Sequence, residues 1–235
     1  MDQLPLAGRV AVVTGVSRFR GIGFAVAARL ASMGASLYVH HFVPHDDAQP
    51  YGADTLIDAA RRAFGHLDIL VCNHARSGSD GTLVAMTAST LDGHWQVNTR
   101  STLLATRAFA AQYDGRDGGR VIWMTSGQQL GPMRDEIAYA TSKAALAGIT
   151  ASVADGLIDQ GISLNTVNPG PVNTGYLDEQ DGDRSVEFVR TLRARFPAGR
   201  LGEPDDPARL IAWLVSDDAR WVVGQTIDSE GGFHR

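Results

Sequence analysis

The sequence predicts an α/β fold in which a doubly wound parallel sheet is covered by helices on both faces. Short apolar runs of the kind found in buried strands alternate with longer segments of helical period along the chain. Glycines stand where three predicted helices should stop before the next strand, at Gly34, Gly65 and Gly161. The 235 residues contain no internal repeat, low-complexity tract or linker, so one domain over residues 1–235 is expected.

The predicted elements follow this alternation. Buried strands, short and rich in apolar residues, are expected at residues 10–14, 35–40, 67–73, 120–125, 162–168 and 225–228. Helices are expected within residues 24–34, 55–65, 94–111, 138–157 and 205–217. Residues 42–53 leave room for a loop only, where a doubly wound sheet normally fits another helix and strand. We therefore expect the third strand–helix unit to be missing or shortened.

The composition excludes several classes of protein. With 44% hydrophobic and 20% charged residues, it is ordinary for a soluble globular protein. A formal charge of −5 leaves no basic surplus to neutralise phosphates, so no nucleic-acid partner is expected. No apolar run approaches the roughly 18 to 20 residues of a membrane span, and the N-terminal segment, with Asp2, lacks the basic start of a signal peptide. A cytoplasmic protein without a membrane partner is expected.

Thiol and metal chemistry are not expected. Cys72 is the one cysteine and lies in the apolar run ILVC, so it is predicted to be a small buried side chain and not a nucleophile. Three histidines and two aspartates gather within residues 40–47, but they lack the fixed spacing of a metal site, and no metal site is predicted.

A glycine-rich loop, TGVSRFRGIG at residues 14–23, joins the first predicted strand to the first predicted helix. Glycines in this setting permit a tight turn and allow the backbone to approach a pyrophosphate at the N-terminus of the helix. The strand, the loop and the helix together predict a dinucleotide site of the Rossmann type.

With this loop the sequence resembles the short-chain dehydrogenase/reductase family, in a ketoreductase-like form. The loop motif of the family is TGxxxGxG, with three residues between its first two glycines. In this sequence five residues, Val16–Arg20, separate them. The run LVCNHA (70–75) is similar to the family's LVNNAG, with Asn73 kept and its neighbours changed. NPGPVNT (168–174) and the segment 200–232 also fit, so the resemblance covers nearly the whole chain.

The stretch YATSK (139–143) holds Lys143, the one lysine among 21 basic residues. At i+4 on a helix, Lys143 lies on the same face as Tyr139. The pKa of a free tyrosine is near 10, and a neighbouring ammonium favours the phenolate, so we expect Lys143 to lower the pKa of Tyr139. An arginine would supply charge but could not give up a proton, which indicates that this position requires an amine. The alternative is a surface lysine that follows a core tyrosine.

Ser126 and Asn98 complete the catalytic set that the resemblance implies, together with Tyr139 and Lys143. Ser126 follows a predicted strand, 13 residues before Tyr139, and its hydroxyl is expected to hydrogen-bond a substrate oxygen; taken alone, it would be a turn or helix cap. Asn98 lies in an apolar helix, where an amide requires partners. In the resembled enzymes this residue holds a water that links the lysine to solvent; the alternative is an exposed helical asparagine.

The resemblance also implies a nicotinamide dinucleotide. The expected contacts come from the glycine loop, the ends of the strands and the catalytic pair: Gly15, Ser17, Arg18, Gly21, Ile22, Gly23, His41, Asn73, Ala75, Tyr139, Lys143, Pro169, Gly170, Val172 and Thr174. NADP(H) is favoured over NAD(H), because His41 replaces the acid that NAD-preferring relatives place on the ribose, and Arg18 suits a 2′-phosphate. The inserted Phe19 and Arg20 leave open that Arg18 points elsewhere.

These residues predict an NAD(P)(H)-dependent oxidoreductase that interconverts a small-molecule carbonyl and a secondary alcohol, with Tyr139 as general acid/base. One alternative is a 3-oxoacyl-thioester (acyl-carrier) reductase. Another is a catalytically idle nucleotide-sensing or scaffold protein, suggested by the short segment 42–53. The resemblance further implies a substrate lid at about 175–197 and a homo-oligomer, a tetramer or a dimer, formed through the helices of Asn98 and Tyr139. His74 is expected to be structural.

Overall fold

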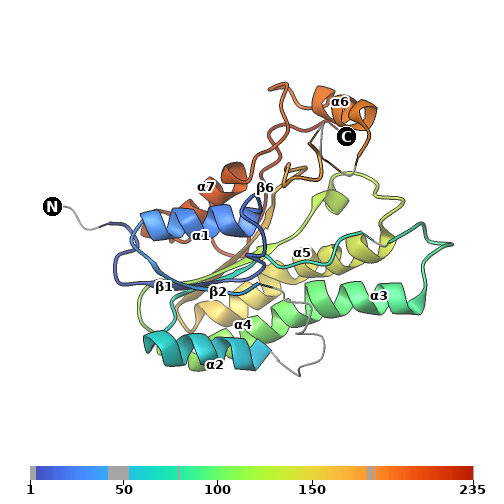
Figure 1. Ribbon diagram of the computed structural model, residues 1–235. Helices are drawn as coiled ribbons and strands as arrows, with labels where there is room; N and C mark the ends of the chain where they lie inside the picture. Colours follow the sequence, from blue (N-terminus) through green and yellow to red (C-terminus); the bar gives the residue numbers. More distant parts are fainter. Residues whose placement is uncertain (1–3, 42–52, 79, 179–181, 183, 235) are drawn as a thin grey trace.

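The described part of the chain forms one sheet of six parallel strands (Figure 1). A computed structural model of the protein describes residues 4–41, 53–78, 80–178, 182 and 184–234. The strands are β1 (Val10–Val13), β2 (Ser36–Val39), β3 (Ile69–Cys72), β4 (Gly119–Met124), β5 (Ile162–Asn168) and β6 (Thr226–Asp228). Their order in the sheet is β2-β1-β3-β4-β5-β6, and every neighbouring pair is parallel. The predicted strands are confirmed, and the fold is Rossmann-like.

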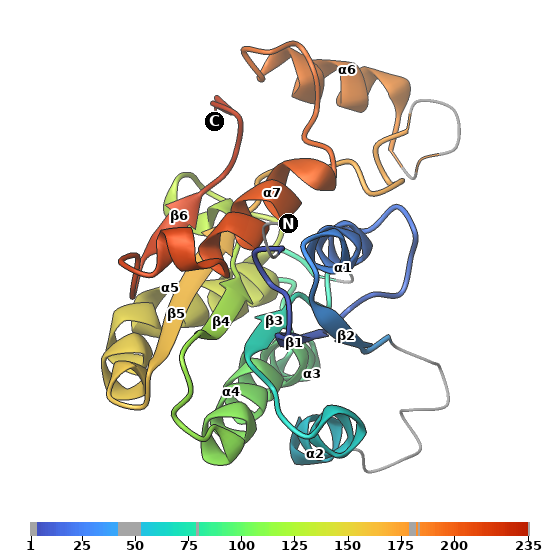
Figure 2. The ribbon, with the colours of Figure 1, turned by 90° about the vertical axis from the view of Figure 1, so that its left-hand side faces the viewer.

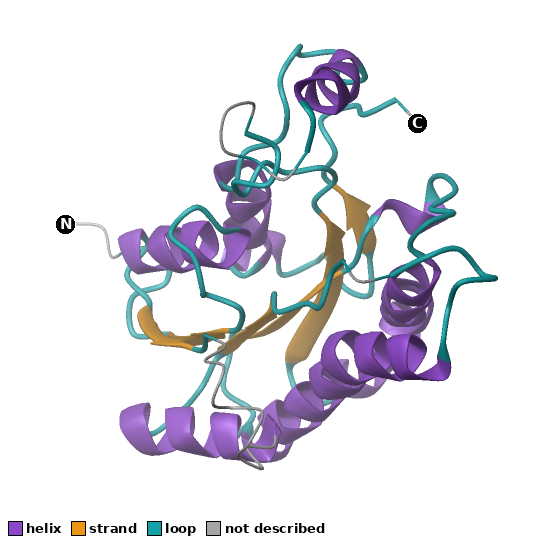
Figure 3. Ribbon diagram, turned by 45° about the vertical axis from the view of Figure 1, so that its right-hand side comes forward, coloured by secondary structure: helices purple, strands orange, loops and turns teal. Residues whose placement is uncertain are grey.

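Helices cover both faces of the sheet (Figures 2 and 3). On one face lie α1 (Ile22–Ser32) and α7 (Asp205–Leu214), and on the other lie α2 (Ala53–Phe64), α4 (Ser101–Gln112) and α5 (Ile137–Ile158). Shorter helical segments are α3 (Ala88–His94), α6 (Val186–Ala194), a π-helical turn at Trp95–Arg100 and 3₁₀ turns at Gly127–Gln129 and Asp217–Ala219. Among the described helices, none combines the length and the apolar character needed to cross a membrane.

The central strands are buried on both faces, because successive side chains of a strand point to opposite sides. Ala11 and Val13 of β1 pack with α1 and α7, whereas Val10 and Val12 pack with α2, α4 and α5. All four residues of β3 and all six of β4 are buried in the same alternating way. This two-sided burial explains why the runs VAVV and ILVC contain no polar residue.

The winding of the sheet reverses between β1 and β3. The chain passes from the central β1 outward to β2 and then returns to β3 on the other side of β1. In open parallel sheets, ligands bind outside the carboxyl ends of the strands at such a point. Within the described residues, β2 pairs only with β1 and is an edge strand. The predicted loss of a third strand–helix unit falls on residues 42–53, of which 42–52 lie outside the described residues.

A third and smaller cluster of apolar side chains includes residues of α6, which stands apart from the sheet near the C-terminus (Figure 1). Val189 of α6 packs with Phe196 and Leu201, and the partly buried Leu177, Leu192 and Phe233 pack against these three. Within the described part of the segment predicted to form a substrate lid, α6 therefore packs with Phe233 near the end of the chain.

Replacing Thr106 with Val is expected to destabilise the fold. The indole N–H of the fully buried Trp123 donates to the Thr106 hydroxyl at 2.9 Å. Valine keeps the shape but leaves the buried donor without its acceptor, which lowers the free energy of unfolding by about 1–3 kcal/mol. Urea unfolding measures the loss. The control is Thr191→Val, the same change at an exposed position of α6, which should alter stability by less than about 0.5 kcal/mol; equal losses in the two variants would contradict the account.

Candidate active site

The predicted catalytic residues meet at the carboxyl edge of the sheet, where parallel strands all end. Ser126 follows β4, and Tyr139 and Lys143 lie in the first two turns of α5. The Lys143 amine donates to the main-chain carbonyl of Met124, the last residue of β4, and the Ser126 side chain lies near enough to the Tyr139 hydroxyl to lower its pKa. The structure therefore brings these predicted side chains together.

Lys143 is buried, with only 2% of its surface exposed. Its Nζ donates to the Met124 carbonyl at 2.8 Å and lies 5.9 Å from the centroid of the Tyr139 ring. Burial lowers the pKa of the amine to about 8, although the neighbouring Cys72 acts in the opposite direction. The amine can therefore change its charge near neutral pH, which a guanidinium cannot do. The alternative interpretation, a surface lysine, is wrong.

Tyr139 is half-buried, and its surroundings differ from the expectation. Burial raises the pKa of the phenol, the hydrogen bond with Ser126 opposes that rise, and the charge of Glu136 adds to it. The expectation that Lys143 lowers the pKa of Tyr139 is wrong here, because burial dominates and the amine points to a main-chain carbonyl. A phenol with a raised pKa is protonated at neutral pH and can donate a proton. Ser126 precedes the Gly127–Gln129 turn, but its side chain makes no capping hydrogen bond.

Asn98 lies in the π-helical turn between α3 and α4, and its side chain is fully buried. Its Oδ1 accepts from the Arg76 N–H at 2.7 Å, and its Nδ2 donates to the Arg76 carbonyl at 3.0 Å and to Ser142 Oγ at 2.9 Å. The alternative of an exposed helical asparagine is wrong. The side chain fastens the segment after β3 to α5, so its amide is already engaged; the water implied by the resemblance stays a prediction.

The glycine loop fits closely against the segment after β3. Gly15 has φ of +72°, and a Cβ there would lie 2.7 Å from the His74 backbone. A Cβ on Gly23 would lie 2.6 Å from Nδ2 of Asn73, and that nitrogen donates to the carbonyls of Thr14 and Gly15 at 3.0 and 3.1 Å. Both glycines are thus required by contacts within the protein, in addition to the predicted approach of a phosphate.

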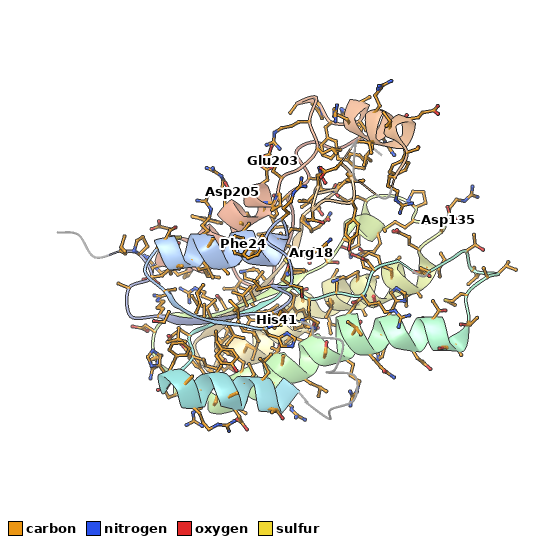
Figure 4. The ribbon with its side chains drawn as sticks, in the orientation of Figure 1. Arg18, Phe24, His41, Asp135, Glu203 and Asp205 are labelled. Carbon is orange, nitrogen blue, oxygen red and sulfur yellow. The ribbon has the colours of Figure 1, made fainter. Side chains whose placement is uncertain are left out.

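Two arginines of the lengthened glycine loop, Arg18 and Arg20, contact the segment after β5. Arg20 binds both carboxylate oxygens of Asp178, at 2.5 and 3.0 Å. The guanidinium of Arg18 lies 4.3 Å from the centroid of the Tyr176 ring, and its Nη2 is 3.5 Å from Thr174 Oγ1. Arg18 and Thr174, both predicted cofactor contacts, are therefore neighbours, and Figure 4 labels Arg18 and His41 among the side chains.

The remaining predicted cofactor residues lie along the same edge. Ser17, His41 and Ala75 are exposed after β1, β2 and β3. Ile22 begins α1 behind Gly21, which offers no capping side chain. The segment after β5 carries the others, Pro169, Gly170, Val172 and Thr174. Their common location is observed, whereas the ligand that they hold stays a prediction. Within the described ranges, no three or more His, Cys, Asp or Glu side chains are grouped to hold a metal ion.

His74 is a structural histidine, as predicted. Its Nδ1 and Nε2 lie 2.6 Å from Thr14 Oγ1 and from Ser101 Oγ, respectively. Burial lowers its pKa to about 4, so the ring is neutral at physiological pH and joins the end of β1 to α4. Burial likewise raises the pKa of Cys72 to about 12, which keeps the thiol protonated and unreactive.

Sequence reasoning missed two acidic residues near the site. Asp178 pairs with Arg20, 158 residues away in the chain. Asp80 accepts hydrogen bonds from the backbone of α5, 58 and 59 residues away. Neither contact produces a periodic pattern or a motif in the sequence. In each case the aspartate and its partner are 58 or more residues apart in the chain.

The fold and this arrangement of side chains are those of a nucleotide-dependent oxidoreductase. Residues 39–234 match the sequence family described as Enoyl-(Acyl carrier protein) reductase. The uncharacterized oxidoreductase YjdA of Bacillus subtilis is 36% identical over 252 residues, with 97% of each chain covered. An NADPH-dependent aldehyde reductase-like protein, chloroplastic, of Arabidopsis thaliana is 32% identical, with 98% of this chain and 96% of that protein covered. The chain belongs to the short-chain dehydrogenase/reductase family and is an oxidoreductase.

Solved structures agree with this assignment. A short-chain dehydrogenase/reductase from Serratia marcescens is 31% identical and superposes with a TM-score of 0.81, covering 97% of this chain and 99% of that chain. LugOII, a promiscuous reductase that catalyzes keto-reduction at C1 during lugdunomycin biosynthesis, is 29% identical with a TM-score of 0.81, covering 97% and 98% of the two chains. The predicted family and the Rossmann-like fold are confirmed.

The burial of Lys143 predicts a pH dependence of stability. The pKa of its amine is about 8 in the folded protein against the ordinary 10.5, so between these values the unfolded chain binds more protons and stability rises with pH. Lys143→Met removes the group. The free energy of unfolding of the wild type relative to this variant should therefore increase across this window, by on the order of 3 kcal/mol. Urea titrations measure it, and a difference that does not change with pH would contradict the burial of an ionisable amine.

Proposed function

We propose that the protein is a ketoreductase that interconverts a small carbonyl compound and a secondary alcohol, with NADP(H) preferred over NAD(H). One observation carries the proposal: a buried amine with a pKa of about 8 lies 5.9 Å from the centroid of the Tyr139 ring, whose hydroxyl is near Ser126, at the carboxyl edge of a parallel sheet. When bound, a nicotinamide dinucleotide supplies the hydride for such a reaction.

The residues present fit such a dinucleotide. Because Gly21 offers no side chain to cap α1, the first-turn N–H groups of that helix are available to an anion such as a pyrophosphate. The contacts of Gly15 and Gly23 with Asn73 hold the loop close to the strand ends, beside the first turn of α1. The loop after β5, from Pro169 to Thr174, borders the same edge of the sheet.

Each side chain of the site has its own role in proton transfer. In reduction, Tyr139 donates a proton to the carbonyl oxygen, and Ser126 hydrogen-bonds the same oxygen while charge develops on it. The raised pKa of Tyr139 keeps the phenol protonated at neutral pH, which suits this direction. Lys143 returns a proton to Tyr139, because a pKa of about 8 allows both charge states of the amine. Asn98 hydrogen-bonds both the segment after β3, at Arg76, and α5, at Ser142.

Three observations support the preference for NADP(H). The two residues directly after β2 are His40 and the exposed His41, so neither is an acid. Arg18 lies beside Thr174 at the same edge, and a guanidinium suits a dianionic 2′-phosphate. The relative from Arabidopsis thaliana bears a name that states NADPH dependence.

Two structural features complete the proposal. We assign the substrate lid to residues 175–197, which include α6 and part of its apolar cluster.

We also propose that the third strand–helix unit is shortened. The alignment with the Bacillus subtilis relative runs over 252 residues, more than the 235 of this chain, and β2 is the edge strand of the described part. A shortened unit leaves the adenine side of the pocket open to water.

Quaternary structure and location are proposals as well. Trp95 and Val97, on the turn between α3 and α4, are 42% and 38% exposed. Covering such side chains favours a homo-oligomer, a tetramer or a dimer, through the helices of Asn98 and Tyr139. A cytoplasmic location stays a prediction from the composition.

A second candidate substrate is a 3-oxoacyl thioester on an acyl carrier. The description of the matching family, an acyl-carrier-protein reductase, favours it. Comparing kcat/KM for a 3-oxoacyl thioester with that for small ketones discriminates the two. The idle scaffold is the third candidate, and the buried lysine at a catalytic position argues against it; a protein that binds neither NADPH nor NADH in a fluorescence titration would favour it.

Tyr139→Phe is expected to abolish turnover while leaving cofactor binding intact. The variant removes the proton donor but keeps the ring, so kcat for ketone reduction should fall by about 10²–10⁴-fold. The Kd of NADPH, measured by fluorescence, should stay within about two-fold. Tyr113→Phe is the matched control: its hydroxyl binds the Arg116 carbonyl at the far end of α4, so kcat should be unchanged. Full activity of the Tyr139 variant refutes the assignment.

Arg18→Ala is expected to reduce the preference for NADP(H). Loss of a charge-assisted contact with the 2′-phosphate should raise the Kd of NADPH by about ten-fold or more and leave that of NADH within about two-fold. Arg20→Ala is the control, because Arg20 is paired with Asp178 and should affect both cofactors alike. Equal effects of the Arg18 variant on both cofactors would show that Arg18 serves the Tyr176 contact only.

A further inference from the structure

The first turn of α5 takes its cap from a distant segment of the chain. The residue before the helix, Glu136, makes no side-chain capping bond, and the first turn contains no acidic residue. Instead, the Ala138 N–H donates to Asp80 Oδ1 at 3.2 Å, and the Tyr139 N–H donates to Asp80 Oδ2 at 2.6 Å. The Ile137 N–H donates to the neighbouring Gly81 carbonyl at 3.2 Å. Three N–H groups that a helix start leaves without partners are thus satisfied from the loop after β3.

This cap acts on the residue that is proposed to transfer the proton. Tyr139 is the third residue of α5, in the turn of a helix that frays most easily. The shortest of the three bonds is the one to its own N–H. A carboxylate at this point also interacts favourably with the partial positive charge of the helix start. Removing it frees the backbone of Tyr139, whereas the rest of this long helix keeps its own hydrogen bonds.

The charge of Asp80 is maintained by the same contacts. Burial acts to raise its pKa, but hydrogen bonds from the backbone of Tyr139, Gly81 and Ala138, with the nearby His94, lower it below its ordinary value. The carboxylate is therefore ionised at neutral pH. Gly81 also donates to Asp80 Oδ1 at 2.8 Å, so the carboxylate holds its own loop and α5 together.

The loop that carries Asp80 is fixed at a second point. Asn98 binds both the N–H and the carbonyl of Arg76, and it also binds Ser142 of α5. The buried His94 of α3 packs edge-on against the Tyr139 ring, with centroids 6.3 Å apart. Asp80 therefore binds the backbone of Tyr139, and His94 of α3 packs against its ring.

We propose that Asp80 is a positioning residue for Tyr139: its carboxylate fixes the first turn of α5, so that the phenol is held near Ser126 and the Lys143 amine. This inference rests on the proposed function in assigning proton transfer to Tyr139. Asp80 itself does not touch the reacting atoms. It acts on turnover and not on the affinity for the dinucleotide, because its contacts are with α5 and not with the glycine loop.

The test compares Asp80→Ala and Asp80→Asn with Asp135→Ala. Asp135 (labelled in Figure 4) is the matched control: it is an exposed aspartate two residues before α5, with no hydrogen bond to the first turn among the described contacts. Hydrogen exchange of the Ala138 and Tyr139 amides reports the cap without any activity assay. Steady-state kinetics with NADPH and a ketone, together with the Kd of NADPH, report the effect on the reaction.

The expected results are specific to the first turn. In Asp80→Ala, the two amides should exchange about ten-fold faster or more, with no change in the middle of α5. The kcat should fall by about ten-fold or more, with the Kd of NADPH within about two-fold. Asp80→Asn retains one acceptor oxygen and should be intermediate in both measurements. Asp135→Ala should behave as the wild type.

Several outcomes would overturn the proposal. They are unchanged exchange in Asp80→Ala, faster exchange with an unchanged kcat, equal effects of the Asp80 and Asp135 variants, or faster exchange throughout α5 in both Asp80 variants. If the wild type does not turn over ketones with NADPH, the proposed function fails instead. The exchange of the two amides then still decides whether Asp80 caps the helix.

Discussion

The burial of the Lys143 amine between α5 and the end of β4 is the constraint on which the site depends. An amine with 2% exposure requires a hydrogen-bond partner, and the Met124 carbonyl provides one at 2.8 Å. This bond holds the start of α5 against the carboxyl edge of the sheet, so Tyr139 lies next to the strand end that carries Ser126. The same burial sets the pKa of the amine near 8. The position of the site and its proton chemistry therefore have one physical cause.

Around this amine, the loops at the strand ends are fastened to one another. Asn73 binds the carbonyls that follow β1, His74 joins Thr14 to Ser101, and Asn98 joins the loop after β3 to α5. These polar groups have their partners inside the protein, as buried polar groups require. The outer side is held differently: Arg20 and Asp178 form a largely exposed ion pair, and exposed pairs contribute little to stability. The site is rigid near the amine and weakly held where the inserted loop meets the segment after β5.

The sequence is sufficient to predict the sheet and to place the candidate catalytic residues, Tyr139 and Lys143, on one helix, but not to predict the contacts that position them. Two-sided burial leaves runs such as VAVV and ILVC without polar residues, so the strands can be read directly. Helical spacing places Tyr139 and Lys143 on one face. The depth of burial is a property of the assembled fold, which is why the raised pKa of Tyr139 could not be foreseen. The partners of Asp80 lie 58 and 59 residues away, and such contacts leave no pattern in the chain.

Because the chain has a single lysine among its 21 basic residues, the central claim can be measured at one atom. Protein labelled at the ε carbon of lysine gives one NMR signal, and its change with pH reports the titration of the Lys143 amine alone. The account predicts a midpoint near 8. A midpoint at the ordinary value of 10.5 would show that the amine is not buried as described and would contradict the account.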